Sequence, residues 1–142
     1  SGEIQEKMNI SRHITYSEAT DSPTAKRLGI DNTPNEAELA HMKLVAERCF
    51  EPLREWYGKP IKINSFFRCD ALNTAVGSKP TSYHRWGMAI DMTGGSKEEN
   101  KKIHDWCAKN LKFTELINEY DFSWVHIAYN PVRLTNTLKV IK

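Results

Sequence analysis

The sequence of 142 residues predicts an α+β fold, in which helices pack on one face of a mostly antiparallel sheet. Two observations favour this class. Stretches with helical periodicity and stretches with alternating polarity follow one another without strict alternation, which argues against a regular series of parallel units. In addition, residues 115–120 and 123–129 alternate on either side of a tight turn, as the two strands of an antiparallel hairpin do.

The first long helix is expected to begin after Thr33 and to end before Gly58. Thr33 is the expected N-cap, the proline that follows suits the first helical position, and Glu36 completes a capping box. Because Pro52 removes one backbone hydrogen bond, a kink or a new start is predicted at residues 50–51. Apolar side chains recur at steps of three and four residues and predict the buried stripe, namely Leu39, Met42, Val45, Cys49 and Leu53.

Shorter helical segments are predicted elsewhere. A capping box formed by Ser96 and Glu99 opens a second long helix. A helical turn is expected at residues 16–19, with Ser17 as its cap, and a short helix at residues 71–73.

Alternating apolar and polar side chains predict the strands. The predicted strands are residues 61–65, 88–92, 115–120, 123–129 and 137–141. The last of them is expected at an edge of the sheet. Residues 1–10 are polar and are expected to be loose, whereas residues 11–142 are expected to form one domain.

Composition excludes several classes of protein. The net charge of +2 and the absence of a basic stripe argue against nucleic-acid binding. No apolar run approaches the roughly 18 residues of a membrane span, and the first residues do not read as a signal peptide. Cys49, Cys69 and Cys107 form no CxxC pair, which favours free thiols and leaves one disulfide open. The oligomeric state is also left open.

Two segments carry side chains that suit a metal ion. Residues 82–91 (SYHRWGMAID) contain His84 and Asp91, and residues 124–126 (WVH) contain His126. Two imidazole nitrogens and one carboxylate oxygen leave a fourth tetrahedral position open for water. This is the ligand count of a catalytic zinc site rather than a structural one.

These residues resemble the signature of a known family. Residues 82–91 are similar to the SxHxxGxAxD signature of the zinc D-Ala-D-Ala peptidases, which comprise carboxypeptidases, dipeptidases and L-Ala-D-Glu endopeptidases of bacteria and their phages. Residues 65–68 (SFFR) are similar to the family's SGYR, and residues 116–119 (LINE) precede the last histidine as in the family. The resemblance runs from about residue 10 to residue 129 and is closest to the carboxypeptidase branch, with D-Ala-D-Ala carboxypeptidase and phage endolysin as the expected types.

The resemblance implies a fold, a cofactor and a substrate class. The implied fold is shared with the amino-terminal signalling domain of hedgehog proteins. The implied cofactor is Zn²⁺, held by His84, Asp91 and His126, with Arg68 and Ser82 in contact with substrate. The implied reaction is hydrolysis of peptidoglycan stem or cross-link peptides that contain D-amino acids, by attack of zinc-bound water on the scissile carbonyl.

The general base is harder to assign. In the dipeptidase and endolysin branches, the base is a glutamate three residues before the last histidine, and here that position is Ser123. Glu119 is the expected replacement, because a hairpin across residues 115–129 brings it close to His126. Asp121 is the alternative, although a turn-forming role suits it as well.

Three further residues are predicted at the site, each with a structural alternative. Arg68 is expected to hold the oxyanion or a substrate carboxylate, or else to tie down its loop. Ser82 is expected to bind substrate or to cap the turn before His84. Trp124 is expected to line the cleft or pack beside the metal, or else to belong to the core.

The leading hypothesis is therefore a zinc metallopeptidase that acts on the bacterial cell wall, in the periplasm or outside the cell. A zinc-containing binding module without turnover is the alternative, and Ser123 keeps it open. A purely structural metal site is a third hypothesis, which none of the cysteines favours. Carboxypeptidase versus endopeptidase action, the bond that is cleaved, and host versus phage origin are not decided by the sequence.

Overall fold

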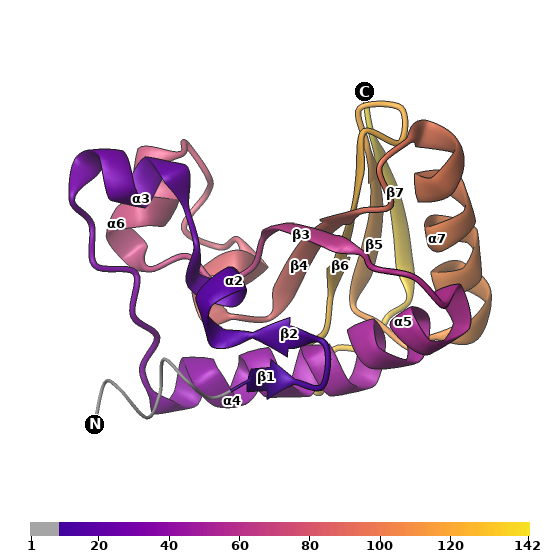
Figure 1. Cartoon of the computed structure of the whole chain (residues 1–142), viewed down its shortest axis with the longest axis horizontal. Helices are drawn as coiled ribbons and strands as arrows, with labels where there is room; N and C mark the ends of the chain where they lie inside the picture. Colours follow the sequence, from indigo (N-terminus) through magenta and orange to yellow (C-terminus); the bar gives the residue numbers. More distant parts are fainter. Residues whose placement is uncertain (1–8) are drawn as a thin grey trace.

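The computed structural model describes residues 9–142 and has the predicted α+β architecture (Figure 1). Of the segment expected to be loose, residues 1–8 lie outside the described part of the chain. Asn9 and Ile10 belong to a short strand, β1 (Asn9–Ser11), and Ile10 is buried. The expectation of a loose segment is therefore wrong for these two residues, because Ile10 reaches the hydrophobic core.

A five-stranded sheet organises the molecule. Its strand order is β3-β4-β6-β5-β7, and each neighbouring pair is antiparallel except β5 and β7, which are parallel. The bounds are β3 (Lys62–Ser65), β4 (Ala89–Thr93), β5 (Glu115–Glu119), β6 (Trp124–Ala128) and β7 (Thr137–Ile141). The predicted strands and the predicted edge position of the last one are thus confirmed. A separate hairpin pairs β1 with β2 (Ile14–Thr15).

The helices surround the sheet on one face and at one end. They are α2 (Tyr16–Thr20), α3 (Pro23–Leu28), α4 (Glu36–Val45), a π-helix (Ala46–Phe50), α5 (Glu51–Tyr57), α6 (Asp70–Ala75), a 3-10 turn (Tyr83–Trp86) and α7 (Lys97–Asn110). Figure 1 shows α4 and α5 as one continuous rod beneath the sheet, with α7 beside it and α3 and α6 together at the opposite end. No helix of the described residues is long and apolar enough to cross a membrane.

The start of the long helix differs from the prediction. Asn35 is the N-cap and forms a capping box with Glu38, whose amide it binds at 2.8 Å. Thr33, the predicted cap, instead donates its hydroxyl to Asp31 at 2.5 Å, so it is occupied outside the helix. The prediction of Thr33 with Glu36 was therefore wrong by two residues, because both pairs have the spacing of a capping box.

Of the two other predicted helix caps, one differs from the structure and one is confirmed. Thr15, not Ser17, caps α2, and it forms a capping box with Glu18. At α7, Ser96 accepts the amide of Glu99 at 3.1 Å, as predicted. The hydroxyl two positions earlier caps α2 because Glu18 stands three residues after Thr15, the spacing that a capping box requires.

The predicted interruption at residues 50–51 is confirmed. The amide of Glu51 bonds to the carbonyl of Ala46, five residues back, and α5 begins at Glu51. In a regular α-helix the ring of Pro52 would clash with the carbonyl of Arg48 and leave it without a donor. The wider π turn accommodates this proline without breaking the rod.

The sheet separates the hydrophobic core from the predicted site. Five fully buried residues of the three central strands belong to the core and share the face that packs on the helices: Ile90, Met92, Leu116, Val125 and Ile127. Asp91 and His126 pair directly across β4 and β6, so both side chains project from the opposite face. The helical stripe of Met42, Val45 and Leu53 is fully buried, as predicted.

The cysteines are free thiols, as the sequence favours. Cys49 and Cys107 are buried and Cys69 is half-buried, and no disulfide joins them. Burial raises the pKa of the Cys49 thiol to about 12, so it stays protonated and behaves as a small apolar side chain.

Candidate metal centre

Three elements bring the predicted ligands together. His84 lies in the 3-10 turn, Asp91 on β4 and His126 on β6. The chain passes from the turn into β4 through Gly87, which has a left-handed φ of +73°. A Cβ at this position would lie 2.6 Å from Cγ of Met42, so only glycine fits. The close contact with α4 fixes the turn and with it the direction of the His84 ring.

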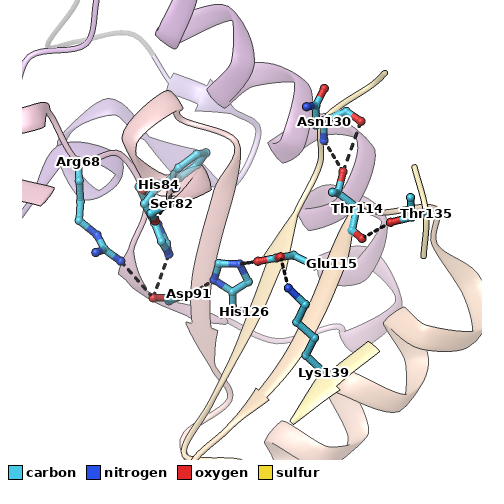
Figure 2. Close-up of polar contacts among 11 residues, drawn as sticks. Arg68, Ser82, His84, Asp91, Thr114, Glu115, His126, Asn130, Thr135 and Lys139 are labelled. Carbon is cyan, nitrogen blue, oxygen red and sulfur yellow. Dashed lines mark hydrogen bonds and ion pairs between the residues drawn. The ribbon is translucent and has the colours of Figure 1, made fainter. Parts of the chain in front are cut away.

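The three side chains converge on one point. Nε2 of His84 lies 3.1 Å from Oδ2 of Asp91, and Nδ1 of His126 lies 2.9 Å from Oδ1 of the same carboxylate (Figure 2). The three side chains each offer a ligand atom, and these atoms lie within 4.8 Å of one another. Ligand atoms of one tetrahedral zinc are about 3.3 Å apart, because each lies about 2.0–2.1 Å from the ion. The cluster therefore needs only small adjustments to enclose an ion.

The two ring nitrogens of His84 differ in their hydrogen bonding. Its Nδ1–H donates to the carbonyl of Phe66 at 2.7 Å, and its Nε2 is buried without a hydrogen-bond partner among the described residues. Burial lowers the pKa of His84 despite the opposing charge of Asp91, so the ring is neutral. A lone pair on Nε2 thus faces a carboxylate with no proton between them. A metal ion satisfies both groups, and the residues fit zinc.

His126 is held by a carboxylate on its far side. Its Nε2 lies 2.8 Å from Oε2 of Glu115, and Nζ of Lys139 lies 3.1 Å from the other oxygen of that carboxylate. Burial opposes ionisation of the ring, but the bonds to Asp91 and Glu115 outweigh it and raise the pKa of His126 to about 9. Donation of Nε2–H to Glu115 leaves Nδ1 free to bind a metal. A carboxylate is a usual hydrogen-bond partner for the second ring nitrogen of a zinc-bound histidine.

Asp91 is the anionic member of the cluster. Burial alone would raise the pKa of its carboxyl, yet His84 and His126 on either side outweigh this and hold the pKa far below its usual range. The carboxylate is therefore ionised at neutral pH. It supplies the negative charge that a divalent cation requires.

Arg68 lies on the opposite side of Asp91 from His126, as Figure 2 shows. Its Nη2 is 3.9 Å from Oδ2 of Asp91. Its Nε and Nη1 donate to the hydroxyls of Ser65 and Ser78 at 3.2 and 2.6 Å. The structure thus shows the loop-tying contacts, and it also places the guanidinium at the edge of the centre. A contact of Arg68 with substrate stays a prediction.

Glu119 lies on the same face as the centre, but one step further along the strand than expected. The residue opposite His126 on β5 is Ile117, whereas Glu119 pairs with Trp124. Burial and then the Asp91 carboxylate raise the pKa of Glu119, while His126 opposes the change. The carboxylate is therefore close enough to the centre for the charges of Asp91 and His126 to change its pKa. Within the described part of the chain, the structure shows no hydrogen bond between Glu119 and the three predicted metal ligands.

The other candidate base has a structural role. Asp121 lies in the exposed turn between β5 and β6, in the left-handed region at φ +54°, and pairs with Lys97 at 3.1 Å. Ser123 donates its hydroxyl to the carbonyl of Tyr120 at 2.6 Å and is exposed. Glu119 is thus the better placed of the two carboxylates predicted for the role.

Ser82 and Trp124 both border the site. Oγ of Ser82 accepts the amide of His84 at 3.3 Å, which is the predicted capping contact, and Ser82 also lines a cleft beside His126. Trp124 is half-buried on the face of the centre, lies outside the core cluster, and has Tyr120 beside it with ring centroids 5.2 Å apart. The core alternative for Trp124 is therefore wrong, because strand alternation turns this side chain away from the helices.

Glu115 and Lys139 were not predicted at the site. Glu115, Ile117 and Glu119 alternate along β5, so all three share the face of His126 once the register is known. The sequence carries that alternation, but the register that brings Glu115 to Nε2 of His126 depends on the turn at residues 120–123. Lys139 joins them because β7 pairs with β5 in parallel, a contact that sequence separation conceals.

A family model supports the assignment that this geometry suggests. The model described as Peptidase M15 matches residues 12–128. The chain belongs to the peptidase M15 family, whose members are zinc peptidases. The match agrees with the resemblance to zinc D-Ala-D-Ala peptidases and does not separate the branches of that group. A search of curated proteins found no match.

Proposed function

We propose that the protein is a zinc-dependent metallopeptidase that hydrolyses peptidoglycan stem or cross-link peptides containing D-amino acids, at the bacterial cell wall. One observation carries the proposal. The lone pair of the buried Nε2 of His84 faces the Asp91 carboxylate 3.1 Å away, beside Nδ1 of His126, in a chain of a zinc peptidase family. This donor set suits an ion that retains a free position for chemistry.

His84, Asp91 and His126 would hold the zinc. When bound, the ion acts as a Lewis acid, which polarises a scissile carbonyl and lowers the pKa of water to about 7. Glu115 has a supporting role, because it fixes the ring of His126 through Nε2 at 2.8 Å and so directs Nδ1 toward the centre.

Glu119 is the proposed general base. It accepts the proton of the attacking water and passes it to the nitrogen of the leaving amine. A carboxylate with a raised pKa suits both steps, because it binds a proton more readily than an ordinary glutamate and still releases it near neutral pH. A modest movement of the side chain toward substrate is part of this proposal.

Arg68 is the proposed cationic donor. Its guanidinium lies at the edge of the centre, fixed by two serine hydroxyls, and is suited to the developing oxyanion or to a substrate carboxylate. Ser82 and Trp124 are proposed to contact the peptide on either side, since both lie on the face of the centre.

The proposal is tested by digestion of purified peptidoglycan. Zinc-loaded protein is incubated with the polymer, and released fragments are weighed by mass spectrometry. The account predicts new amino termini and a fixed mass loss per stem peptide, which also distinguishes carboxypeptidase from endopeptidase action. His126→Ala and a chelated sample are predicted to release nothing. His13→Ala is the matched control, since His13 lies between β1 and β2, bonds to Glu51 at 2.6 Å and is outside the cluster.

A binding module without turnover is the second candidate. The observation that favours it is Ser123, which occupies the position of the base in two branches of the related peptidases and is tied to Tyr120. This candidate predicts that intact stem peptides bind to the zinc-loaded chain and are recovered unchanged. A known lytic peptidase is run under the same conditions as a positive control. If it cleaves the peptide and this chain binds the peptide without cleaving it, the result supports the binding module.

A further inference from the structure

A cleft of about 650 Å³ opens beside the metal centre on the side of Glu115. His126 and Glu115 are among the residues that line it. One wall comes from the segment that precedes and begins the 3-10 turn, with Lys79 among its residues, and the other from the C-terminal segment that includes Arg133 and Lys139. The proposed catalytic groups Glu119 and Arg68 do not line it, so the cleft adds a region that the mechanism above leaves unused.

The charge of this cleft is positive. Lys79, Arg133 and Lys139 face it together with a single carboxylate, Glu115. Lys139 already pairs with that carboxylate at 3.1 Å. Among the described residues, Lys79 and Arg133 have no ion-pair partner within 4.0 Å. Two cations are therefore uncompensated beside the centre, and they attract an anionic group of a ligand.

The wall that carries Arg133 is fixed in place. Asn130 donates its amide to Oγ1 of Thr114 at 2.7 Å, and the hydroxyl of Thr135 donates to the Thr114 carbonyl at 2.9 Å (Figure 2). The amide of Arg133 bonds to the Asn130 carbonyl at 2.9 Å, which closes a turn. Arg133 thus projects from a turn anchored at both ends to the start of β5, rather than from a free tail.

This wall also lies beyond the part of the chain that the family model matches, which ends at Ala128. The match ends at the last residue of β6, before the anchored turn and β7. The ligand set belongs to the matched part, and the cationic wall is an addition to it.

We propose that this cleft is a subsite for a peptide carboxylate, with Arg133 as the principal donor and Lys79 opposite it. The guanidinium can bind both carboxylate oxygens through parallel hydrogen bonds. The proposal rests on the proposed function in that it takes the ligand to be a peptide lying across the centre. The carboxylate is either that of an acidic side chain or the C-terminal one, and both offer the same chemistry to Arg133.

Four synthetic peptides of one length, each containing D-alanine, test the subsite. They combine an acidic residue or its amide counterpart with a C-terminal carboxylate or carboxamide. Dissociation constants are measured with the zinc-loaded full chain by NMR titration, and the same spectra report whether the peptide remains intact. The variants are Arg133→Gln, Arg133→Lys and, as a control, Lys109→Gln, which removes an exposed charge on α7 that does not line the cleft.

The wild-type chain is expected to bind one carboxylate peptide about tenfold more tightly than its amide counterpart, the effect of one charge-assisted pair at a partly exposed site. Arg133→Gln is expected to abolish this ratio while leaving amide binding unchanged, Arg133→Lys to keep part of it, and Lys109→Gln to keep all of it. The pair of peptides that shows the ratio identifies the source of the carboxylate. Equal affinities in the wild type, or a ratio that persists in Arg133→Gln, overturn the subsite.

Failure of the subsite and failure of the proposed function give different results. Cleavage of the peptides without any carboxylate preference that depends on Arg133 overturns the subsite and supports the peptidase. A preference that depends on Arg133, with every peptide recovered intact, supports the subsite and counts against the peptidase.

Discussion

At the scale of single residues, the protonation states of His84 and His126 determine how the centre binds a metal. His84 is neutral because burial outweighs the attraction of Asp91, and its Nδ1–H is committed to the Phe66 carbonyl. His126 lies between two carboxylates and holds a proton up to about pH 9. Both ring nitrogens of His126 are therefore protonated at pH 7. A nitrogen that binds zinc carries no proton, so zinc binding must displace the proton on Nδ1.

Zinc binding is accordingly predicted to release a proton. At pH 7, below the raised pKa of His126, close to one proton per chain is expected to leave, and the apparent affinity for zinc is expected to rise about tenfold per pH unit until near pH 9. Calorimetric titration in two buffers of different ionisation enthalpy measures the release. Asp91→Ala is expected to abolish high-affinity binding, whereas His13→Ala, which removes a histidine outside the cluster, serves as the control. An affinity independent of pH contradicts the protonation of His126.

Glu119 gives a second prediction at this scale. As a general base it acts only when ionised, so kcat/KM must fall as pH drops through its pKa, which burial raises. Glu119→Gln is predicted to lower kcat about 10²–10⁴-fold and to remove this part of the profile. Peptide hydrolysis across pH at saturating zinc is the measurement.

Asp121→Asn is the matched control for that experiment, because Asp121 was the alternative base and pairs with Lys97 in an exposed turn. Near wild-type activity is expected. A profile that follows Asp121 rather than Glu119 reverses the assignment.

The sequence predicted the three clustered residues, because they belong to a dense signature with fixed spacing. It did not predict Glu115 as the partner of His126. That contact depends on register, and in this hairpin the register is set by Tyr120, Asp121 and Phe122, all in the left-handed region at φ of 51–57°. None of the three is glycine, so the sequence gives no sign of this backbone.

At the scale of elements, the turn between His84 and β4 depends on one contact. A Cβ at Gly87 would lie 2.8 Å from the carbonyl oxygen of Glu38, a backbone atom that cannot move without shifting α4. Gly87→Ala is predicted to destabilise the fold by about 1–3 kcal/mol more than Gly58→Ala. Gly58 is the matched control because its φ is +74° and a Cβ there meets nothing within 4 Å.

Denaturant unfolding of the two variants measures the difference, and the shared cost of a left-handed alanine cancels. Equal losses in both variants would mean that α4 yields to the added methyl group. The Gly87 variant is also expected to bind zinc more weakly, because the turn carries His84.

Asn100 joins three elements from a buried position on α7. Its Oδ1 accepts the Gly94 amide at 2.7 Å at the end of β4, and its Nδ2 donates to the carbonyl of Phe122 at 2.8 Å in the turn that follows Glu119. Asn100→Ala is predicted to cost about 2–3 kcal/mol, since buried backbone groups lose their partners.

Asn110→Ala, at the exposed end of the same helix, is the control for this variant and is expected to stay within about 0.5 kcal/mol of the wild type. Thermal and denaturant unfolding provide the comparison. A loss at Asn100 no larger than at Asn110 contradicts the role assigned to the amide.

Long elements were predictable, whereas short ones were predictable only in part: the helices α2 and α6 were expected and are present. Strong periodicity in the sequence predicted the long helix and all five strands of the sheet. The interruption of the helix was predicted from Pro52. The hairpin of β1 and β2 and the helix α3 were not predicted, because segments this short are stabilised by contacts with the rest of the molecule. Two helix caps differ from the prediction by two residues, at α4 because two candidate pairs have the same capping-box spacing.

At the scale of the whole molecule, the sheet has two unlike faces. One packs on α4, α5 and α7 and forms the core, and the other carries the metal centre and its carboxylates. Because alternation assigns each strand residue to a face, Asp91 and His126 project away from the core while they lie on the adjacent strands β4 and β6. The fold class followed from this alternation, whereas the parallel addition of β7 did not, since no local pattern records a pairing across the 130–136 turn.

The account as a whole claims a zinc-dependent hydrolytic centre formed by His84, Asp91 and His126. The most direct test is the rate of hydrolysis of a defined D-alanine-containing stem peptide, measured while zinc is added to the chelated protein. The rate is predicted to rise linearly, to break at one equivalent of zinc per chain, and to stay at zero in His126→Ala. Hydrolysis that is equally fast without zinc, or no hydrolysis of any stem peptide at saturating zinc, contradicts the account.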